Sequence, residues 1–170
     1  MPELPEVETM RIQLEKFLVG HVIDKIEIRD KRYEIRDKEK LVGTKIDGVR
    51  RFAKVTSIDL SNGYSILTHV KLTGQYIYRG PNLPHVAEGS AGLSKKVVGG
   101  VPGPHTLIIF NLDRDGKLYY NDIRRFGWIK IVKTSEVENE PFVKKLGPEP
   151  FKGLALKVFQ EILSKNLKGN

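Results

Sequence analysis

The first 20 residues carry apolar side chains at helical spacing. Pro5 suits the first position of a helix, Glu6 and Glu8 place negative charge where the helix dipole favours it, and Gly20 is a good stop signal. The apolar positions fall on one helical face: Val7, Met10, Leu14, Phe17 and Leu18. The pattern predicts a helix from Pro5 to about Gly20, approached by an extended segment over residues 1–4.

After Gly20 the spacing of apolar residues changes from helical to a period of two. Strand-like stretches are predicted at residues 22–29, 45–50, 53–60, 64–71, 75–79, 106–112, 118–121 and 127–132. Ser61-Asn62-Gly63 and Arg114-Asp115-Gly116-Lys117 are typical of hairpin turns. Many short strands with tight turns favour a mainly β fold with flanking helices: a two-layer antiparallel β-sandwich with the N-terminal α-helix packed on it.

Three stretches depart from the strand pattern. Residues 30–42 are charged and irregular, and residues 80–104 are rich in Gly and Pro without periodicity. A loop that long is usually functional or mobile. Near the end, a second helix is predicted over residues 153–165, with Leu156, Phe159, Ile162 and Leu163 on one face.

Composition narrows the choice of partner. Apolar residues make up 39% of the 170 residues, enough to bury a core, and 29 Lys and Arg against 21 Asp and Glu give a net charge of +8. This excess favours a polyanion, nucleic acid before a membrane surface. The absence of Cys excludes disulfides, zinc-thiolate sites and cysteine nucleophiles within these residues. No apolar run approaches the roughly 20 residues of a membrane span, and no signal peptide is visible, so we expect a cytoplasmic protein.

The N-terminus offers candidate chemistry. Removal of Met1, which precedes a small residue, would leave Pro2 with a free secondary amine. An α-amino group is partly neutral near pH 7, and a secondary amine that attacks a sugar C1′ gives a charged iminium, which is a strong electron sink. Glu3 would lie beside it as a proton shuttle. On its own, a Pro-Glu terminus is more often a stiff end with a solvated carboxylate.

Longer motifs favour the chemical interpretation. The stretch Pro2-Glu3-Leu4-Pro5-Glu6-Val7-Glu8-Thr9 resembles the opening of bacterial formamidopyrimidine-DNA glycosylases, which remove oxidised purines. The sister family, endonuclease VIII, typically has Gly at the position of Leu4. Further matching blocks follow in the family's order: Arg50-Arg51-Phe52-Ala53-Lys54, His69-Val70-Lys71-Leu72-Thr73-Gly74, Pro104-His105-Thr106, Asp122-Ile123-Arg124-Arg125-Phe126-Gly127 and Leu146-Gly147-Pro148-Glu149-Pro150. Together they span nearly the whole chain.

The resemblance implies a role for each residue of the reacting centre. Pro2 would displace the damaged base and form a Schiff base with the sugar, and the iminium would acidify the C2′ proton, allowing β- and then δ-elimination. Glu3 would be the acid/base that assists opening of the sugar ring, and Glu6 would help to order the site. Lys54 would bind a phosphate close to the lesion; an isolated lysine here would be taken as an exposed strand residue.

The resemblance also implies DNA-binding residues. An enzyme that attacks C1′ must extrude the nucleotide, so an apolar wedge must fill the hole and a hydrogen-bonding group must hold the partner base. Phe126 would be the wedge and Arg124 the fork that holds the base, with Arg125 beside them. Leu72 stands where the family has Met, which preserves space filling without the thioether. His69 and His105 occupy positions of histidines near phosphates, although a strand His is as often a structural hydrogen-bonder.

The resemblance divides the chain into parts. Residues 1–132 would form the catalytic β-sandwich domain, 133–152 a linker, and 153–170 the first helix of a truncated helix–two-turn–helix domain. The family's four-cysteine zinc finger has no counterpart here, so no metal or other cofactor is expected in this chain. The expected partner is double-stranded DNA with oxidised purines or abasic sites, bound by a monomer and not at a membrane. With part of the binding surface missing, poor DNA binding and turnover are expected.

Two other functions fit parts of the sequence. A non-catalytic DNA-binding or damage-sensing module would keep the fold without the chemistry, and borohydride trapping on abasic DNA separates it from an enzyme. A tautomerase that uses Pro2 as a general base is a second alternative. Tautomerases of that kind are shorter and built from βαβ units, which the many hairpins and the Arg124–Phe126 motif disfavour.

Overall fold

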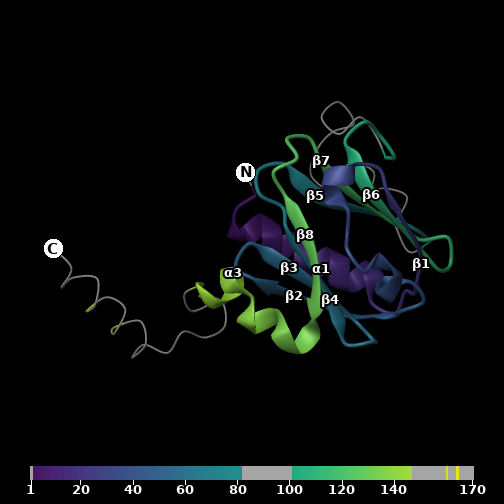
Figure 1. The fold of residues 1–170 in the computed structure, drawn as a ribbon. Helices are drawn as coiled ribbons and strands as arrows, with labels where there is room; N and C mark the ends of the chain where they lie inside the picture. The colour runs from purple at the N-terminus through teal and green to yellow at the C-terminus, as the bar shows by residue number, and fades with distance from the viewer. Residues whose placement is uncertain (1, 82–100, 147–159, 161–163, 165–170) are drawn as a thin grey trace.

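The strands form two four-stranded antiparallel sheets. The computed structural model describes residues 2–81, 101–146, 160 and 164 (Figure 1). One sheet has the order β1–β6–β7–β5, with bounds Ile23–Ile28, Thr106–Leu112, Lys117–Asp122 and Gly74–Arg79. The other has the order β2–β3–β4–β8, with bounds Ile46–Phe52, Val55–Leu60, Tyr64–His69 and Trp128–Lys133. The predicted β-sandwich is confirmed, and each predicted strand is found with its ends shifted by three residues or fewer.

Helix α1 (Leu4–Leu18) begins one residue before Pro5, so the expectation that residue 4 is extended was wrong. No Ser, Thr, Asp or Asn caps this end. Instead the carboxylate of Glu6 accepts a hydrogen bond from the backbone N–H of Glu3 at 2.9 Å. This bond satisfies one of the donors that a helix start leaves unpaired and extends the helix toward the N-terminus.

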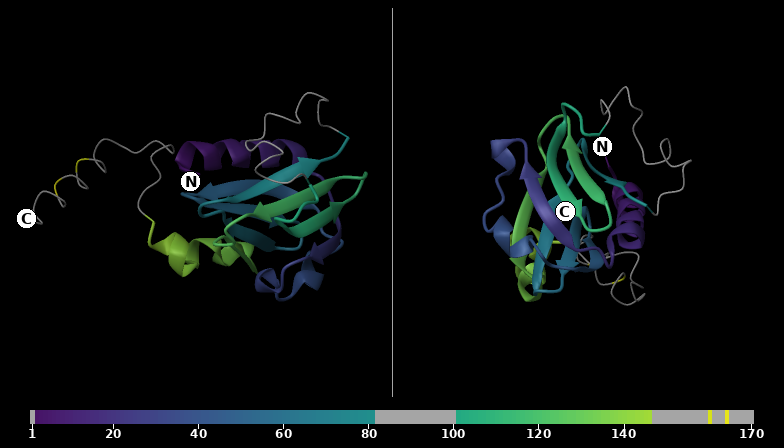
Figure 2. Two further views of the ribbon diagram at one scale, coloured as in Figure 1. Left: turned by 90° about the horizontal axis from the view of Figure 1, so that it is seen from above. Right: turned by 90° about the vertical axis from the view of Figure 1, so that its right-hand side faces the viewer.

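The apolar face of α1 covers one open side of the sandwich. There β2 and β5 are the edge strands of the two sheets, and α1 packs mainly on β2 (Figure 2). Val7, Leu14 and Leu18 are buried, as the helical spacing predicted. The ring of Phe17 stacks on Tyr78 of β5, with centroids 5.6 Å apart. The helix thereby joins both sheets along their edge.

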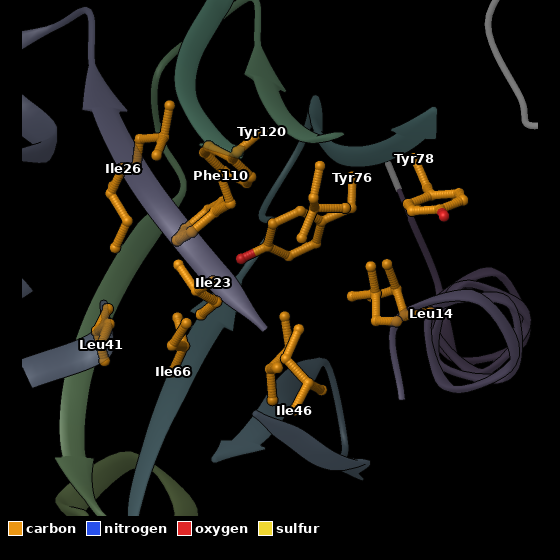
Figure 3. Close-up of a cluster of buried hydrophobic side chains, with 14 of the residues drawn as sticks. Leu14, Ile23, Ile26, Leu41, Ile46, Ile66, Tyr76, Tyr78, Phe110 and Tyr120 are labelled. Atoms are coloured by element: carbon orange, nitrogen blue, oxygen red, sulfur yellow. The ribbon is translucent and has the colours of Figure 1, made fainter. Parts of the chain in front are cut away.

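Between the sheets lies one large hydrophobic core, to which the charged segment 30–42 also contributes. That segment contains two short 3₁₀ helices, η1 (Lys31–Tyr33) and η2 (Lys38–Leu41), which bury Tyr33 and Leu41. Figure 3 shows side chains from both sheets and from α1 converging in the core: Leu14, Ile23, Ile46, Ile66, Tyr76 and Phe110. Burying such side chains is the main force that holds the two layers together.

The predicted linker contains short helices in its described part. η3 (Thr134–Asn139) packs on β4 and β8, and α3 (Pro141–Lys144) follows it. Val137 is fully buried with Val55 and Leu67, on the face of the sheet away from the main core. The domain boundary at residue 132 stays a prediction. Most of the 80–104 loop lies outside the described residues, and so does the helix predicted over 153–165 apart from residues 160 and 164, which are both helical. Within the described part, no helix is long and apolar enough to span a bilayer.

Both predicted hairpin turns form. The residues with left-handed backbone occupy different positions in the two turns. In the β6–β7 turn, Arg114 and Asp115 have φ of 54° and 57°, while Gly116 follows them. A Cβ at Gly116 would lie 3.0 Å from the ring of His21, so this glycine is needed for close approach. In the β3–β4 turn, Gly63 itself has φ of 79°.

Replacing Gly63 should test this turn. The Gly63→Ala variant places a Cβ in the left-handed region and should lower the free energy of unfolding by about 1 kcal/mol. Gly48→Ala is the matched control, because Gly48 lacks a positive φ and has no atom within 4 Å of the added Cβ. Urea denaturation measures both variants. Equal stabilities of the two variants would contradict the assignment of strain to Gly63.

Candidate functional site

The predicted site residues converge at one end of the sandwich because of strand register. In the second sheet Val55 pairs with His69, and His69 pairs with Trp128. The β2–β3 turn, the β4–β5 turn and the β7–β8 connection therefore all leave the sheet at the same end. In the first sheet Gly74 pairs with Asp122, which brings that sheet's matching end to the same place. Loops far apart in sequence thus form one surface.

The N-terminus of α1 joins this surface through an ion pair. The ammonium of Lys54, in the β2–β3 turn, donates to Oε2 of Glu3 at 2.6 Å. Pro2, partly buried, directly precedes Glu3. Ala53 beside Lys54 has φ of 49°, which turns the chain tightly here. The three residues predicted to be catalytic are thus assembled from segments about 50 positions apart in sequence.

A buried guanidinium fixes α1 against this turn. Nε of Arg51, on β2, donates to the carboxylate of Glu8 on α1 at 2.5 Å, and Nη1 donates to the carbonyl of Ala53 at 2.9 Å. Arg51 is buried. Burial raises the pKa of Glu8, but hydrogen bonds and positive charges from Arg51 and Arg11 outweigh burial, so the net pKa is lowered. Glu8 therefore stays ionised, and the pair holds Glu3 and Lys54 in reach of one another.

A second buried group organises the loops on the other side of the surface. Asp122, at the end of β7, is fully buried. Its carboxylate accepts hydrogen bonds from Thr73 Oγ1 at 2.5 Å, Gly127 N–H at 2.8 Å and the Tyr33 hydroxyl at 3.1 Å. One side chain thus ties together the β4–β5 turn, the β7–β8 connection and η1.

The β7–β8 connection presents an arginine and an aromatic ring to solvent. The backbone N–H of Arg124 donates to Thr73 Oγ1 at 2.9 Å, and the Arg124 guanidinium lies over the ring of Phe126, 5.1 Å from its centroid. Phe126 is 54% exposed, so it is not an ordinary core aromatic. An exposed ring on a loop held by a buried carboxylate has the geometry that a wedge needs. Its insertion into DNA stays a prediction.

The remaining predicted DNA contacts surround this loop. Arg125 has φ of 57° and pairs with Asp30 at 3.3 Å. Leu72 is partly buried in the β4–β5 turn. The carbonyl of His105 accepts the Asp122 N–H at 3.0 Å, which places His105 at the same end. Their contacts with DNA stay predictions.

His69 combines a structural role with its place in the site. Its Nδ1 accepts the Lys71 N–H at 3.0 Å, and its ring lies 5.2 Å from that of Phe142 and 5.9 Å from that of Trp128. Burial, and then the positive charges of Lys71 and Lys54, lower the pKa of His69 to about 4. His69 is therefore neutral at pH 7, and a phosphate would meet its Nε2–H rather than a charged imidazolium.

This depressed pKa predicts a loss of stability in mild acid. Between the folded pKa of about 4 and the ordinary value of 6.5, the unfolded chain binds a proton at His69 that the folded chain does not. The free energy of unfolding should therefore fall as the pH is lowered from 6.5 to 4, by up to about 3 kcal/mol. Denaturation at pH 7 and pH 4.5 should show a larger loss for the parent than for His69→Gln. An equal loss in both proteins would contradict the pKa.

Sequence reasoning did not predict the contacts of the residues that hold the site together. Asp122, Thr73, Glu8 and Arg51 lie inside the matching blocks, but their contacts are between distant segments. Tyr33 lies in the segment described as irregular, and only its aromatic character among charged residues was a signal. In the described part of the chain, no group of three or more His, Cys, Asp or Glu side chains could hold a metal ion.

Comparison with known proteins defines the class. The model of the formamidopyrimidine-DNA glycosylase N-terminal domain matches residues 1–129. The formamidopyrimidine-DNA glycosylase of Rhodopseudomonas palustris strain BisB18 is 35% identical over 164 residues, covering 88% of this chain and 51% of that protein. That of Desulforamulus reducens is 35% identical over 175 residues, covering 99% and 56%. This chain thus spans about half the length of the curated relatives that it matches.

Solved structures agree with this assignment. Lactococcus lactis formamidopyrimidine-DNA glycosylase, non-covalently bound to DNA containing an AP site, superposes with a TM-score of 0.74 at 29% identity, covering 96% of this chain and 58% of that one. The same enzyme in complex with FAPY-dG-containing DNA gives 0.74 at 30% identity, covering 96% and 57%. The chain belongs to the formamidopyrimidine-DNA glycosylase family of DNA repair proteins.

Proposed function

We propose that this domain supplies the reacting centre for excision of oxidised purines, 8-oxoguanine and formamidopyrimidines, from double-stranded DNA, followed by strand cleavage at the abasic site. The observation that carries the proposal is the 2.6 Å contact between Glu3 and Lys54, directly beside Pro2. A nucleophile, a carboxylate and a cation suited to a phosphate meet at the same end of the sandwich as the exposed ring of Phe126.

The first step requires a mature chain that begins at Pro2. Its secondary amine attacks C1′, the C1′–N bond to the damaged base breaks, and the base leaves with the bonding electrons and takes up a proton. The Pro2 nitrogen then loses its own proton to the Glu3 carboxylate. Its lone pair forms the C1′=N bond as the electrons of the C1′–O4′ bond move onto O4′, and Glu3 passes the proton to O4′. The product is an iminium between Pro2 and C1′, which needs no redox cofactor.

Strand cleavage follows from the charge of that iminium. Electron withdrawal acidifies the C2′ proton, so a base removes it and the 3′ phosphate leaves in a β-elimination. A δ-elimination then releases the 5′ phosphate. Lys54 neutralises a phosphate beside the sugar, and its bond to Glu3 keeps its ammonium close to the reacting atoms. Glu6, which caps the Glu3 backbone, holds the first turn of α1 in place.

Access to C1′ requires the nucleotide to leave the duplex. Phe126 is exposed and is proposed to fill the vacated space together with Leu72, while Arg124 donates to the acceptor edge of the partner base. Arg125, His69 and His105 border this surface and are proposed to bind nearby phosphates. Relatives solved with FAPY-dG-containing and AP-site-containing DNA support this class of substrate. We propose a monomer acting in the bacterial cytoplasm, with no metal in these residues.

Borohydride trapping tests the reaction directly. The mature protein, with Pro2 confirmed as its first residue by intact mass, is incubated with duplex DNA that contains an abasic site, and borohydride is added. The expected product is a covalent adduct that peptide mapping places on Pro2. An adduct on Lys54 would move the nucleophile from Pro2 to that lysine. No adduct while the protein still binds the duplex would leave a non-catalytic DNA-binding module as the better description.

A further inference from the structure

The sequence pattern describes residues 30–36 as part of a charged and irregular segment. In the structure, the apolar and the basic side chains of segment 29–36 face opposite ways. Tyr33 and Ile35 are buried in the main core. Its basic side chains are all exposed: Arg29, Lys31, Arg32 and Arg36. We call these four the basic face of segment 29–36. The segment therefore has apolar anchors inward and positive charge outward.

This segment is fixed to the loop that carries Arg124 and Phe126. The Tyr33 hydroxyl donates to Asp122, the same carboxylate that binds the Gly127 N–H, and the rings of Tyr33 and Tyr120 lie 5.7 Å apart. Asp30 pairs with Arg125 at 3.3 Å. Two contacts, one buried and one near the surface, therefore hold segment 29–36 directly beside the β7–β8 connection.

Most of the positive charge on this face is available to a ligand. Within the described part of the chain, neither Lys31 nor Arg36 forms an ion pair with a carboxylate. Arg29 donates to the carbonyl of Gly103, which leaves its charge uncompensated. Arg32 meets Asp30 only at 3.7 Å, with 63% of its side chain exposed. Glu34 is the one exposed acidic residue of the segment. An exposed ion pair such as that of Arg32 and Asp30 contributes little to stability, so Arg32 can exchange it readily for a phosphate.

We propose that the basic face of segment 29–36 binds backbone phosphates of the DNA strand opposite the damaged nucleotide. This inference rests on the proposed function, because Arg124 is assigned to the partner base on that strand. A rigid segment beside Arg124 and Arg125 then lies along the same strand. Its contacts are to phosphates, so they add affinity and fix the orientation of the duplex without reading sequence.

The salt dependence of DNA binding tests the proposal. Each phosphate neutralised contributes about 0.9 to the slope of log K against log salt concentration. The double variant Lys31→Gln/Arg32→Gln should lower that slope by about 1 to 2, measured with a duplex containing an unreactive tetrahydrofuran site. Lys31→Arg/Arg32→Lys keeps both charges and should keep the slope, and it shows that the exposed positions tolerate substitution.

A control variant removes the same charge elsewhere. Lys45 and Lys133 are exposed and lie at the opposite end of the second sheet, next to Ile46 and paired with Tyr64. Lys45→Gln/Lys133→Gln should leave the slope unchanged. A loss as large as that of the Lys31/Arg32 variant would mean that net charge alone is being measured and would overturn the inference.

Phosphate ethylation interference assigns the strand. In the wild type, ethylation at phosphates opposite the lesion should reduce binding, and this interference should disappear in the Lys31/Arg32 variant. Interference that disappears only on the lesion strand, or an unchanged slope, would overturn the proposal. Borohydride trapping on the same proteins separates the two hypotheses. A wild type that traps while the slope stays unchanged refutes this inference alone, and a changed slope without trapping refutes the catalytic proposal alone.

Discussion

Capping the nitrogen of Pro2 should abolish covalent capture of abasic-site DNA. A variant with one Gly inserted ahead of Pro2 converts that nitrogen to an amide, whose lone pair is delocalised into the carbonyl and is not nucleophilic. The added glycine carries a primary amine, but it is displaced by one residue from Glu3 and Lys54, and a misplacement of this size costs orders of magnitude in rate. We expect the rate of adduct formation to fall at least about 100-fold.

Binding must be measured beside trapping in this experiment. The capped chain should bind duplex with a tetrahydrofuran site as the parent does, because no surface side chain has changed. Capture at the parent's rate by the capped protein would remove Pro2 from the mechanism. Loss of capture together with loss of binding would be assigned to a disturbed first turn of α1.

Removal of the Asp122 carboxylate should have the largest effect on stability. Asp122→Ala leaves the Tyr33 hydroxyl and the Gly127 N–H without their buried acceptor, and it frees Thr73 as well. Each hydrogen-bond donor left unpaired in the interior costs about 1 to 3 kcal/mol. We therefore expect the free energy of unfolding to fall by about 3 to 5 kcal/mol. Chemical denaturation measures this difference.

The same change should weaken DNA binding beyond its effect on folding. Asp122 holds the loop of Arg124 and Phe126 against the β4–β5 turn, so its loss releases both segments even where the chain remains folded. Asp47→Ala is the control for stability, since Asp47 is exposed and pairs with Lys45 at the surface. Its effect on the free energy of unfolding should stay within about 0.5 kcal/mol. A similarly small loss for Asp122→Ala would show that the loops are held by other contacts.

The spacing of apolar residues was sufficient to predict most of the secondary structure, because the apolar residues of each element lie on the face that the fold buries. The face formed by Val7, Leu14 and Leu18 is buried, and every predicted strand is present. Errors occurred at element ends, where single contacts decide. Glu6 extends α1 to Leu4, and β4 ends two residues before the predicted limit because the Gly74 N–H bonds to the Val70 carbonyl at 2.8 Å. Such contacts depend on geometry that periodicity does not carry.

The candidate site depended on sequence and structure in different ways. The motifs singled out Pro2, Glu3, Lys54, Arg124 and Phe126 through resemblance, and the register of Val55, His69 and Trp128 explains why these distant segments meet. The motifs gave no role to Asp122 or Arg51, because residue type alone does not distinguish a buried acidic or basic side chain from an exposed one. Its partners become known only when the chain is folded.

The sequence by itself determined the elements of the sandwich, the family and the residues that are candidates for the chemistry. The elements follow from residue type and spacing, and the family and the candidate residues follow from the matching motifs. Only the tertiary structure decided that Glu3 meets Lys54, that Phe126 is exposed, and that segment 29–36 stands beside the Arg124 loop. These relations arise because strand pairing and buried hydrogen bonds bring together segments that local sequence cannot relate.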